Sequence, residues 1–189
     1  SSAKASHKFL GAEFGNTWSL LLPLPHIAGI NVLIRSLELG TEPIDLRNHE
    51  GEYPQADFTA IVPTQLFRAL NGDDRLLRHL QAAKAVLVGG AALAPEVQMQ
   101  ASAAQINVVT SYGSSETAGG CVYNGTPLDG VEVSITPEKK IALKGAVLAT
   151  TYLGAQTLWD TNINVGWLIT SDSGRIENEK LIVEGRIDD

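Results

Sequence analysis

The sequence predicts an α/β protein, in which a mainly parallel sheet flanked by helices is followed by a small antiparallel, barrel-like β subdomain. In the first part of the 189-residue chain, apolar strand-like runs alternate with segments of helical spacing. After Gly120 the segments become short, alternating and separated by turns, with no convincing helix between them. We therefore expect an α/β subdomain at 1–122, a β-rich subdomain at 123–184 and a hinge motif at 185–189.

The expected parallel strands are short apolar runs, which lie at 17–25, 42–46, 58–63, 84–90 and 106–110. Helices are predicted between them. Apolar side chains recur at helical spacing over 28–39, and Gly40 follows where a helix C-cap is expected. A second helix is expected at 64–70, and a third begins at Pro95, a residue tolerated in the first helical turn. This alternation favours a sheet with helices on its faces.

The later segments predict antiparallel pairing. They read "VEVSIT", "KIALKG", "GWLITS", "GRIEN" and "KLIVEG", and the residues at 178–179 suit a hairpin turn between the last two. Lys139, Lys140 and Lys144 are expected on a solvated hairpin face.

Composition excludes several classes of function. The net charge is −7 without a cluster of Lys or Arg, which argues against nucleic acid as a partner. No apolar run approaches the roughly 20 residues of a membrane helix, so we expect no membrane insertion. The single cysteine, Cys121, fits a reducing compartment, and we expect a cytoplasmic protein in which Cys121 is a small core residue.

Two of the expected strands end in glycine-rich loops, "VLVGGAALAPE" and "VVTSYGSSETAGG". Ligands bind beyond the carboxyl ends of strands in open parallel sheets, and glycine lets the backbone approach them closely. In the second loop, Tyr112 can stack on a base, and the hydroxyls of Ser114, Ser115 and Thr117 can reach phosphate oxygens. Glu116 offers a hard oxygen ligand for Mg²⁺. The alternative is that both loops are surface turns whose hydroxyls are solvated caps.

Other candidate residues follow along the chain. His26 stands between a strand and a helix, Asp172 stands at the end of a strand, and Arg186 lies close to the C-terminus. An acidic side chain near a nucleotide commonly accepts hydrogen bonds from ribose hydroxyls, and an arginine can assist there or contact a phosphate.

Three motifs in this order resemble the adenylate-forming superfamily of acyl-CoA synthetases, firefly luciferases and adenylation domains. The residues YGSSE at 112–116 match its Tyr-Gly-x-Thr-Glu motif, and SD at 171–172, after Thr170, matches its Thr-Gly-Asp motif. GRID at 185–188 matches its Gly-Arg-x-Asp hinge motif. The chain departs from the pattern in having Ser115 for Thr and Ser171 for Gly. The resemblance extends over almost the whole chain.

The resemblance assigns roles to individual residues. Eight residues are implied to bind the nucleotide, where they would border adenine, stack on it, or hold phosphate and ribose. They are Gly89, Gly90, Ala91, Tyr112, Gly113, Ser115, Asp172 and Arg186. Those implied to contact the acyl substrate are His26, Arg35 and Gly113. Those implied to be catalytic are His26, Ser115, Glu116 and Arg186, with Glu116 as the magnesium ligand and Asp188 as the hinge between catalytic conformations.

Within the superfamily, segments such as "LPHIAGINVLIRSLELG" resemble the o-succinylbenzoate–CoA ligases of menaquinone biosynthesis. This resemblance implies ATP, Mg²⁺ and coenzyme A as cofactors and a small carboxylate as substrate. It also implies that the phosphate loop and the C-terminal lid are missing, so we expect an inactive fragment of the large domain. The alternatives are another acyl- or aryl-CoA ligase of the superfamily, or a catalytically inactive fragment that binds a nucleotide or acyl group.

Some residues have simpler interpretations. Arg35 could pair with Glu38 or Asp45 instead of a substrate. The other histidines, which stand in polar and charged contexts, are expected at the surface, and the three tryptophans are expected to pack: His7, His49 and His79; Trp18, Trp159 and Trp167.

Overall fold

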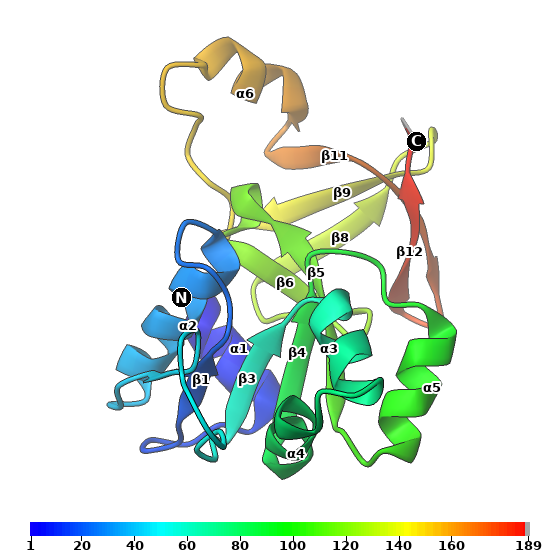
Figure 1. Cartoon of the computed structure of the whole chain (residues 1–189). Coiled ribbons are helices and arrows are strands. Elements are labelled where there is room, and N and C mark those ends of the chain that lie inside the picture. The colour runs from blue at the N-terminus through cyan, green and yellow to red at the C-terminus, as the bar shows by residue number, and fades with distance from the viewer. Residues whose placement is uncertain (188–189) are drawn as a thin grey trace. The chain divides into compact units, whose positions relative to one another are not determined.

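The computed structural model describes residues 1–187 of the chain (Figure 1). The chain divides into two compact units, Ala3–Ser111 and the residues from Tyr112 onward, with Ser1 and Ser2 grouped with the latter. We call them the N-terminal unit and the C-terminal unit. The division falls within strand β5 (Val108–Ser114), upstream of the domain boundary after residue 122, which stays a prediction.

The N-terminal unit contains a parallel sheet, as the sequence predicts. Its strands lie in the order β2-β1-β3-β4-β5, and each neighbouring pair is parallel. The central strands are buried along nearly their whole length, as expected where helices cover both faces of a sheet. Besides β5, the strands are β1 (Trp18–Leu20), β2 (Ile44–Asp45), β3 (Phe58–Ile61) and β4 (Ala85–Gly89).

Helices flank this sheet on two faces (Figure 1). They are α1 (Ser2–Leu10), α2 (Ile27–Glu38), α3 (Pro63–Leu70), α4 (Asp74–Ala82) and α5 (Pro95–Ala103). The ring of Trp18 in β1 contacts His7 of α1 and Arg35 of α2. The next residue, Ser19, faces the other way and bonds His79 of α4. Successive residues of β1 therefore contact helices on opposite faces of the sheet.

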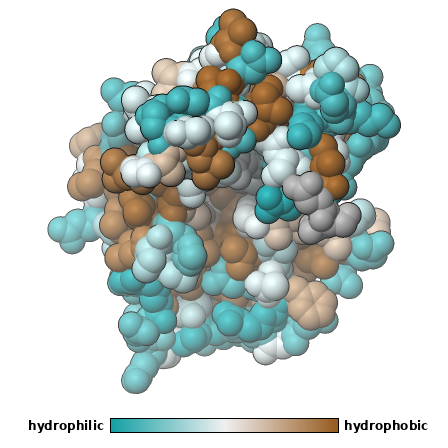
Figure 2. Space-filling model, turned by 90° about the horizontal axis from the view of Figure 1, so that it is seen from above, coloured by the Kyte–Doolittle hydropathy of each residue, from teal (hydrophilic) through white to brown (hydrophobic). Residues whose placement is uncertain are grey.

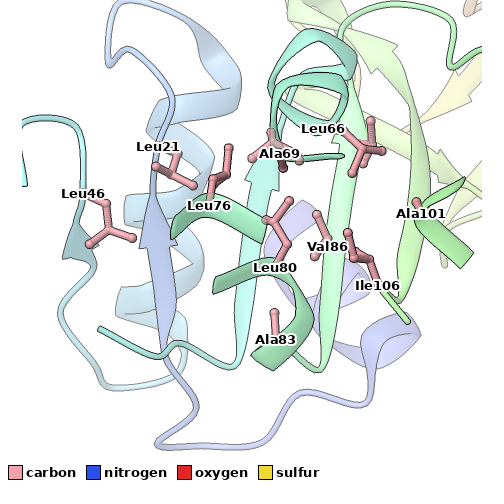
Figure 3. Packing of buried hydrophobic residues seen from close by; sticks show 12 residues of the cluster. Leu21, Leu46, Leu66, Ala69, Leu76, Leu80, Ala83, Val86, Ala101 and Ile106 are labelled. Atoms are coloured by element: carbon pink, nitrogen blue, oxygen red, sulfur yellow. The ribbon is translucent and has the colours of Figure 1, made fainter. Parts of the chain in front are cut away.

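A buried apolar cluster lies between the sheet and helices α3, α4 and α5 (Figure 3). Leu66 of α3 and Leu80 of α4 are fully buried and pack with Val86 of β4. Local residues begin two of these helices: Asp73 caps α4 by accepting from the Leu76 N–H at 3.0 Å, and Pro95 opens α5. Of the N-terminal helices, α1 and α4 were not predicted from the sequence.

Two histidines expected at the surface are buried, so that expectation is wrong. His7 is 6% exposed and His79 is 3% exposed. They lie on α1 and α4, two helices that were not predicted from the sequence, and an amphipathic helix can bury a polar residue on its inner face. Burial lowers the pKa of both imidazoles, and the nearby Arg35 lowers that of His7 further.

The C-terminal unit contains the predicted antiparallel sheet, in the order β10-β11-β9-β8 with β12 paired to β11. Asn178 and Glu179 form the predicted turn, and both have positive φ, +48° and +62°, as a tight two-residue hairpin requires. Cys121 is buried as expected, and burial raises its pKa to about 11. The strands of this unit are β6 (Gly119–Tyr123), β7 (Thr126–Pro127), β8 (Val131–Ile135), β9 (Lys140–Gly145), β10 (Ile163–Asn164), β11 (Trp167–Glu177) and β12 (Lys180–Arg186).

The β-rich region also holds a helix, α6 (Gln156–Asn162), which contradicts the expectation of none (Figure 1). Its sequence, QTLWDTN, lacks apolar periodicity, and Trp159 is its buried residue. Large apolar side chains nearby are exposed, including Leu153 at 100% and Leu158 at 58%. Hydrophobic residues accordingly reach the surface among hydrophilic ones in Figure 2. Among residues 1–187, no helix has the length and apolarity needed to cross a membrane.

Candidate functional site

The end of β5 requires glycine at position 113. This residue has a φ of +158°, and a Cβ here would lie 2.2 Å from the Gly119 carbonyl oxygen. Only glycine therefore fits where the end of β5 passes the start of β6. The strand continues to Ser114, and a short 3₁₀ turn, η1 (Ser115–Thr117), follows. Tyr112 thus lies in the strand, whereas the sequence suggested a polar loop from this point.

Thr117 holds the turn together from inside. Its hydroxyl accepts from the Ser114 N–H at 2.9 Å and donates to the Gly119 carbonyl at 2.7 Å, and the residue is fully buried. The suggestion that Thr117 could reach a phosphate is therefore wrong, because its hydroxyl is used within the loop. Ser114 and Ser115 are exposed, and Ser115 remains the candidate phosphate contact.

Glu116 accepts hydrogen bonds at both its backbone carbonyl and its side-chain carboxylate. Its carbonyl accepts from the Ala149 N–H at 2.7 Å, and its Oε1 accepts from the Tyr152 hydroxyl at 2.6 Å. Burial opposes ionisation of this carboxyl, but hydrogen bonds from Tyr152 and Ser114 outweigh it and lower its pKa. Glu116 therefore presents an ionised, partly buried carboxylate.

Tyr112 and Asp172 meet within the C-terminal unit. The Tyr112 hydroxyl donates to Asp172 Oδ2 at 2.8 Å, and burial raises the pKa of this phenol well above its usual range. The sequence suggested that Asp172 stands at the end of a strand, whereas it lies inside β11. The pairing of β11 with β9 is irregular between Ile169 and Ser173, and such bulges redirect side chains. Thr170 supports this geometry, because its hydroxyl accepts from the Asp172 N–H at 3.2 Å.

Arg186 lies directly across from Asp172 in the β11–β12 pairing. Its guanidinium is exposed and donates to the Ser171 hydroxyl at 2.9 Å. The two motif residues, one acidic and one basic, therefore occupy facing positions on adjacent strands. Asp188, the predicted hinge, lies outside the described residues.

The glycine pair at the end of β4 belongs to the N-terminal unit. A Cβ on Gly89 would lie 2.8 Å from the Ser111 carbonyl oxygen, which requires glycine for close strand packing. Gly90 has a φ of +83° and is exposed, as is Ala91. The backbone at this strand end is thus accessible.

His26 and Arg35 lie at either end of α2. His26 is the exposed N-cap residue with extended backbone, so it precedes the helix, as the sequence predicts. Arg35 is only 5% exposed, and its guanidinium carbon lies 5.0 Å from the centre of the Trp18 ring. This cation–π contact stabilises the Arg35 charge. The sequence had suggested a substrate carboxylate, Glu38 or Asp45 as the partner of that charge.

Tyr152 is a further candidate site residue, which was not predicted from the sequence. It contacts Glu116 from 36 residues away, in a segment without a recognised motif. The hydrogen bond to Glu116 raises the pKa of this phenol. No local pattern could reveal the contact, since it depends on how the segment after β9 folds back.

The described C-terminal unit thus holds two groups of candidate residues: Tyr112, Asp172 and Arg186, and the ionised carboxylate of Glu116 near the exposed hydroxyl of Ser115. Over residues 1–187, no group of three or more His, Cys, Asp or Glu side chains is arranged to hold a metal ion. A lone carboxylate suits Mg²⁺, which is usually held by one or two carboxylates, water and substrate phosphates.

Comparison with known sequences identifies 2-succinylbenzoate–CoA ligases among the relatives of this chain. No protein-family model matches the chain. A probable 2-succinylbenzoate–CoA ligase of Mycobacterium tuberculosis is 38% identical over 203 residues, covering 100% of this chain and 52% of the relative. The 2-succinylbenzoate–CoA ligase of Escherichia coli K12 is 33% identical over 181 residues, covering 90% and 39%. The chain spans about half the length, or less, of these curated relatives.

Solved structures agree with this. Escherichia coli MenE with a bound m phenylether-linked analogue of OSB-AMS matches with a TM-score of 0.81 at 30% identity, covering 99% of this chain and 43% of that one. The o-succinylbenzoate CoA synthetase of Bacillus subtilis, in complex with the acyl-adenylate intermediate OSB-AMP, matches with a TM-score of 0.85. It is 24% identical and covers 100% of this chain and 44% of that one, so it supports the fold alone. The predicted fold class is confirmed.

Proposed function

We propose that the chain supplies the nucleotide-binding part of a 2-succinylbenzoate–CoA ligase, because it aligns with about half the length, or less, of such ligases. In the proposed reaction, the carboxylate of 2-succinylbenzoate attacks the α-phosphate of ATP, and pyrophosphate leaves. The thiol of coenzyme A then displaces AMP from the acyl-adenylate. The contribution of the protein is to position the reactants and to neutralise charge.

The observation that carries the proposal is the Tyr112–Asp172 hydrogen bond with Arg186 on the facing strand. The bond occupies one lone pair of Asp172 and leaves others for ribose hydroxyls. Tyr112, half-buried and fixed by its hydroxyl, presents a ring for an adenine to stack on. Arg186 is exposed and can contact ribose or phosphate.

Glu116 is the proposed magnesium ligand and Ser115 the proposed phosphate contact. When bound, Mg²⁺ would neutralise phosphate charge on the nucleotide. The ionised carboxylate of Glu116 and the exposed hydroxyl of Ser115 fit this role. Gly113 lets the backbone of the same loop approach the ligand.

For the N-terminal unit, the proposal rests on the sequence resemblance. We assign the adenine border to Gly89, Gly90 and Ala91, the acyl pocket to His26, and the distal substrate carboxylate to Arg35. Arg35 is buried against Trp18, so a substrate carboxylate that pairs with its guanidinium would also be removed from water. We also propose a cytoplasmic location, which the free, buried Cys121 supports.

Thermal unfolding of the chain with stable acyl-adenylate mimics tests the proposal. One mimic carries a 2-succinylbenzoyl group and the other a fatty acyl group. Saturation at about 100 times Kd adds roughly 2.7 kcal/mol of stability, which raises Tm by about 5–10 °C in a chain of this size.

We expect stabilisation by the 2-succinylbenzoyl mimic, with the preference reduced in Arg35→Lys and all nucleotide binding reduced in Asp172→Ala. Equal stabilisation by both mimics would favour a different acyl-CoA ligase. A response to neither would contradict the proposed nucleotide site.

A further inference from the structure

The segment between β9 and α6 grips Glu116 at two points. The Ala149 N–H reaches the Glu116 carbonyl at 2.7 Å, and the Tyr152 hydroxyl reaches Oε1 at 2.6 Å. One contact fixes the backbone of this residue and the other fixes the end of its side chain. A glutamate that is held in this way loses rotamer freedom.

Tyr152 is itself held in place by packing against Trp159. Its ring meets the edge of Trp159 with centroids 5.2 Å apart and planes at 89°, and Trp159 is only 6% exposed. The neighbouring Thr151 hydroxyl bonds Gln156 Oε1 at 2.5 Å, which ties the segment to the first turn of α6. The phenol is therefore held towards Glu116 by packing as well as by its own hydrogen bond.

We propose that Tyr152 is a positioning residue for the metal-binding carboxylate of Glu116, an inference that rests on the proposed function. The phenol donates to Oε1 and Ser114 also bonds the carboxylate, but a carboxylate has about four lone-pair sites, so some remain for a cation. Mg²⁺ demands near-ideal octahedral geometry at 2.0–2.1 Å, and a carboxylate free to rotate meets that demand poorly. Hydrogen bonds to coordinating carboxylates typically change metal affinity about 10–100-fold.

A pair of matched variants of the whole chain tests this. Tyr152→Phe deletes the hydroxyl that bonds Glu116, and Tyr112→Phe deletes the hydroxyl that bonds Asp172. Calorimetry would measure the affinity for ATP with Mg²⁺, for ATP with a chelator, and for AMP with a chelator. The ratio of the first two affinities reports the contribution of the metal.

We expect Tyr152→Phe to reduce this ratio about tenfold while AMP affinity stays within about twofold. Tyr112→Phe should weaken ATP and AMP alike and leave the ratio unchanged. A role of Tyr152 confined to folding would lower all affinities together or none. If the ratio in Tyr152→Phe equals that of the wild type, the inference is overturned and the proposed function stands.

If the wild type binds AMP but shows no magnesium enhancement, the magnesium role of Glu116 fails, and the inference falls with it. If Tyr152→Phe does not fold, as judged by circular dichroism, Trp159→Phe provides the second test. It keeps the Tyr152 hydroxyl but weakens its support. We expect a smaller loss of magnesium enhancement, and an unchanged ratio would count against the inference.

Discussion

Tyr112 and Asp172, 60 residues apart in the sequence, are joined by a hydrogen bond of 2.8 Å from phenol to carboxylate. The bond links β5 to β11 within the C-terminal unit. Both residues belong to motifs that the sequence associates with a nucleotide. Their contact means that the ring and the acid cannot be perturbed independently.

Asp172→Asn should weaken binding of AMP about 10–100-fold. A hydrogen bond to a charged group contributes about 1.5–3 kcal/mol, and each 1.4 kcal/mol corresponds to a factor of ten in Kd. Calorimetric titration with AMP measures the effect. Glu132→Gln is the control, because Glu132 is an exposed carboxylate on β8 of the same unit. Equal affinity in Asp172→Asn and the wild type would remove Asp172 from the nucleotide site.

Glu116→Gln should abolish the enhancement of ATP binding by Mg²⁺ and leave AMP binding nearly unchanged. An amide keeps an acceptor for Tyr152 but carries no charge for a cation. Titrations of ATP with and without Mg²⁺ would show the two affinities converge. Glu138→Gln, on the exposed β8–β9 turn, should behave as the wild type. A preserved enhancement in Glu116→Gln would locate the metal elsewhere.

Gly113→Ala should destabilise the C-terminal unit by about 2–5 kcal/mol, from an unfavourable φ and a steric clash. The added Cβ would lie 2.2 Å from the Gly119 oxygen, so strand β6 must move. Gly130→Ala is the control, because Gly130 has a φ of +80° but nothing within 4 Å of a Cβ. It should cost about 1–2 kcal/mol. Denaturant unfolding of both variants compares the values, and equal losses would contradict the clash.

The sequence predicted the parallel sheet well because its signals are local. Apolar runs such as 84–90 and the proline that opens α5 act within a few residues. The same holds for the turn at 178–179, where two positive φ angles follow from the hairpin length. Helix α6 has no such signal, because a single tryptophan, Trp159, anchors it.

The candidate site was predictable only in part. Motif residues such as Glu116 stand out by type and spacing, whereas their partners do not. Tyr152 reaches Glu116 through tertiary folding. Ser115 and Thr117 both carry hydroxyls, and the sequence does not show that the Thr117 hydroxyl turns inward. The burial of His79 likewise depends on α4 packing against Ser19, a contact across 60 residues.

His79 should make the stability of the N-terminal unit depend on pH. Burial lowers its pKa in the folded state below the ordinary 6.5, so the unfolded chain takes up a proton more readily. Stability is therefore full above about pH 6.5 and falls as the pH decreases towards the folded pKa, by up to about 1.4 kcal/mol per pH unit. His7 shifts in the same direction and adds to the effect.

Urea unfolding of the wild type and of His79→Gln, from pH 7.5 down to 5.5, measures this dependence. Glutamine can still bond the Ser19 hydroxyl, which lies 2.8 Å from His79 Nε2, but it does not titrate. We expect the variant to lose part of the slope below pH 6.5, with the remainder removed by adding His7→Gln. The fold is then less sensitive to acid although it is no more stable at neutral pH. Parallel curves for the wild type and His79→Gln would mean that the buried imidazole accepts its proton as readily in the folded chain as in the unfolded one.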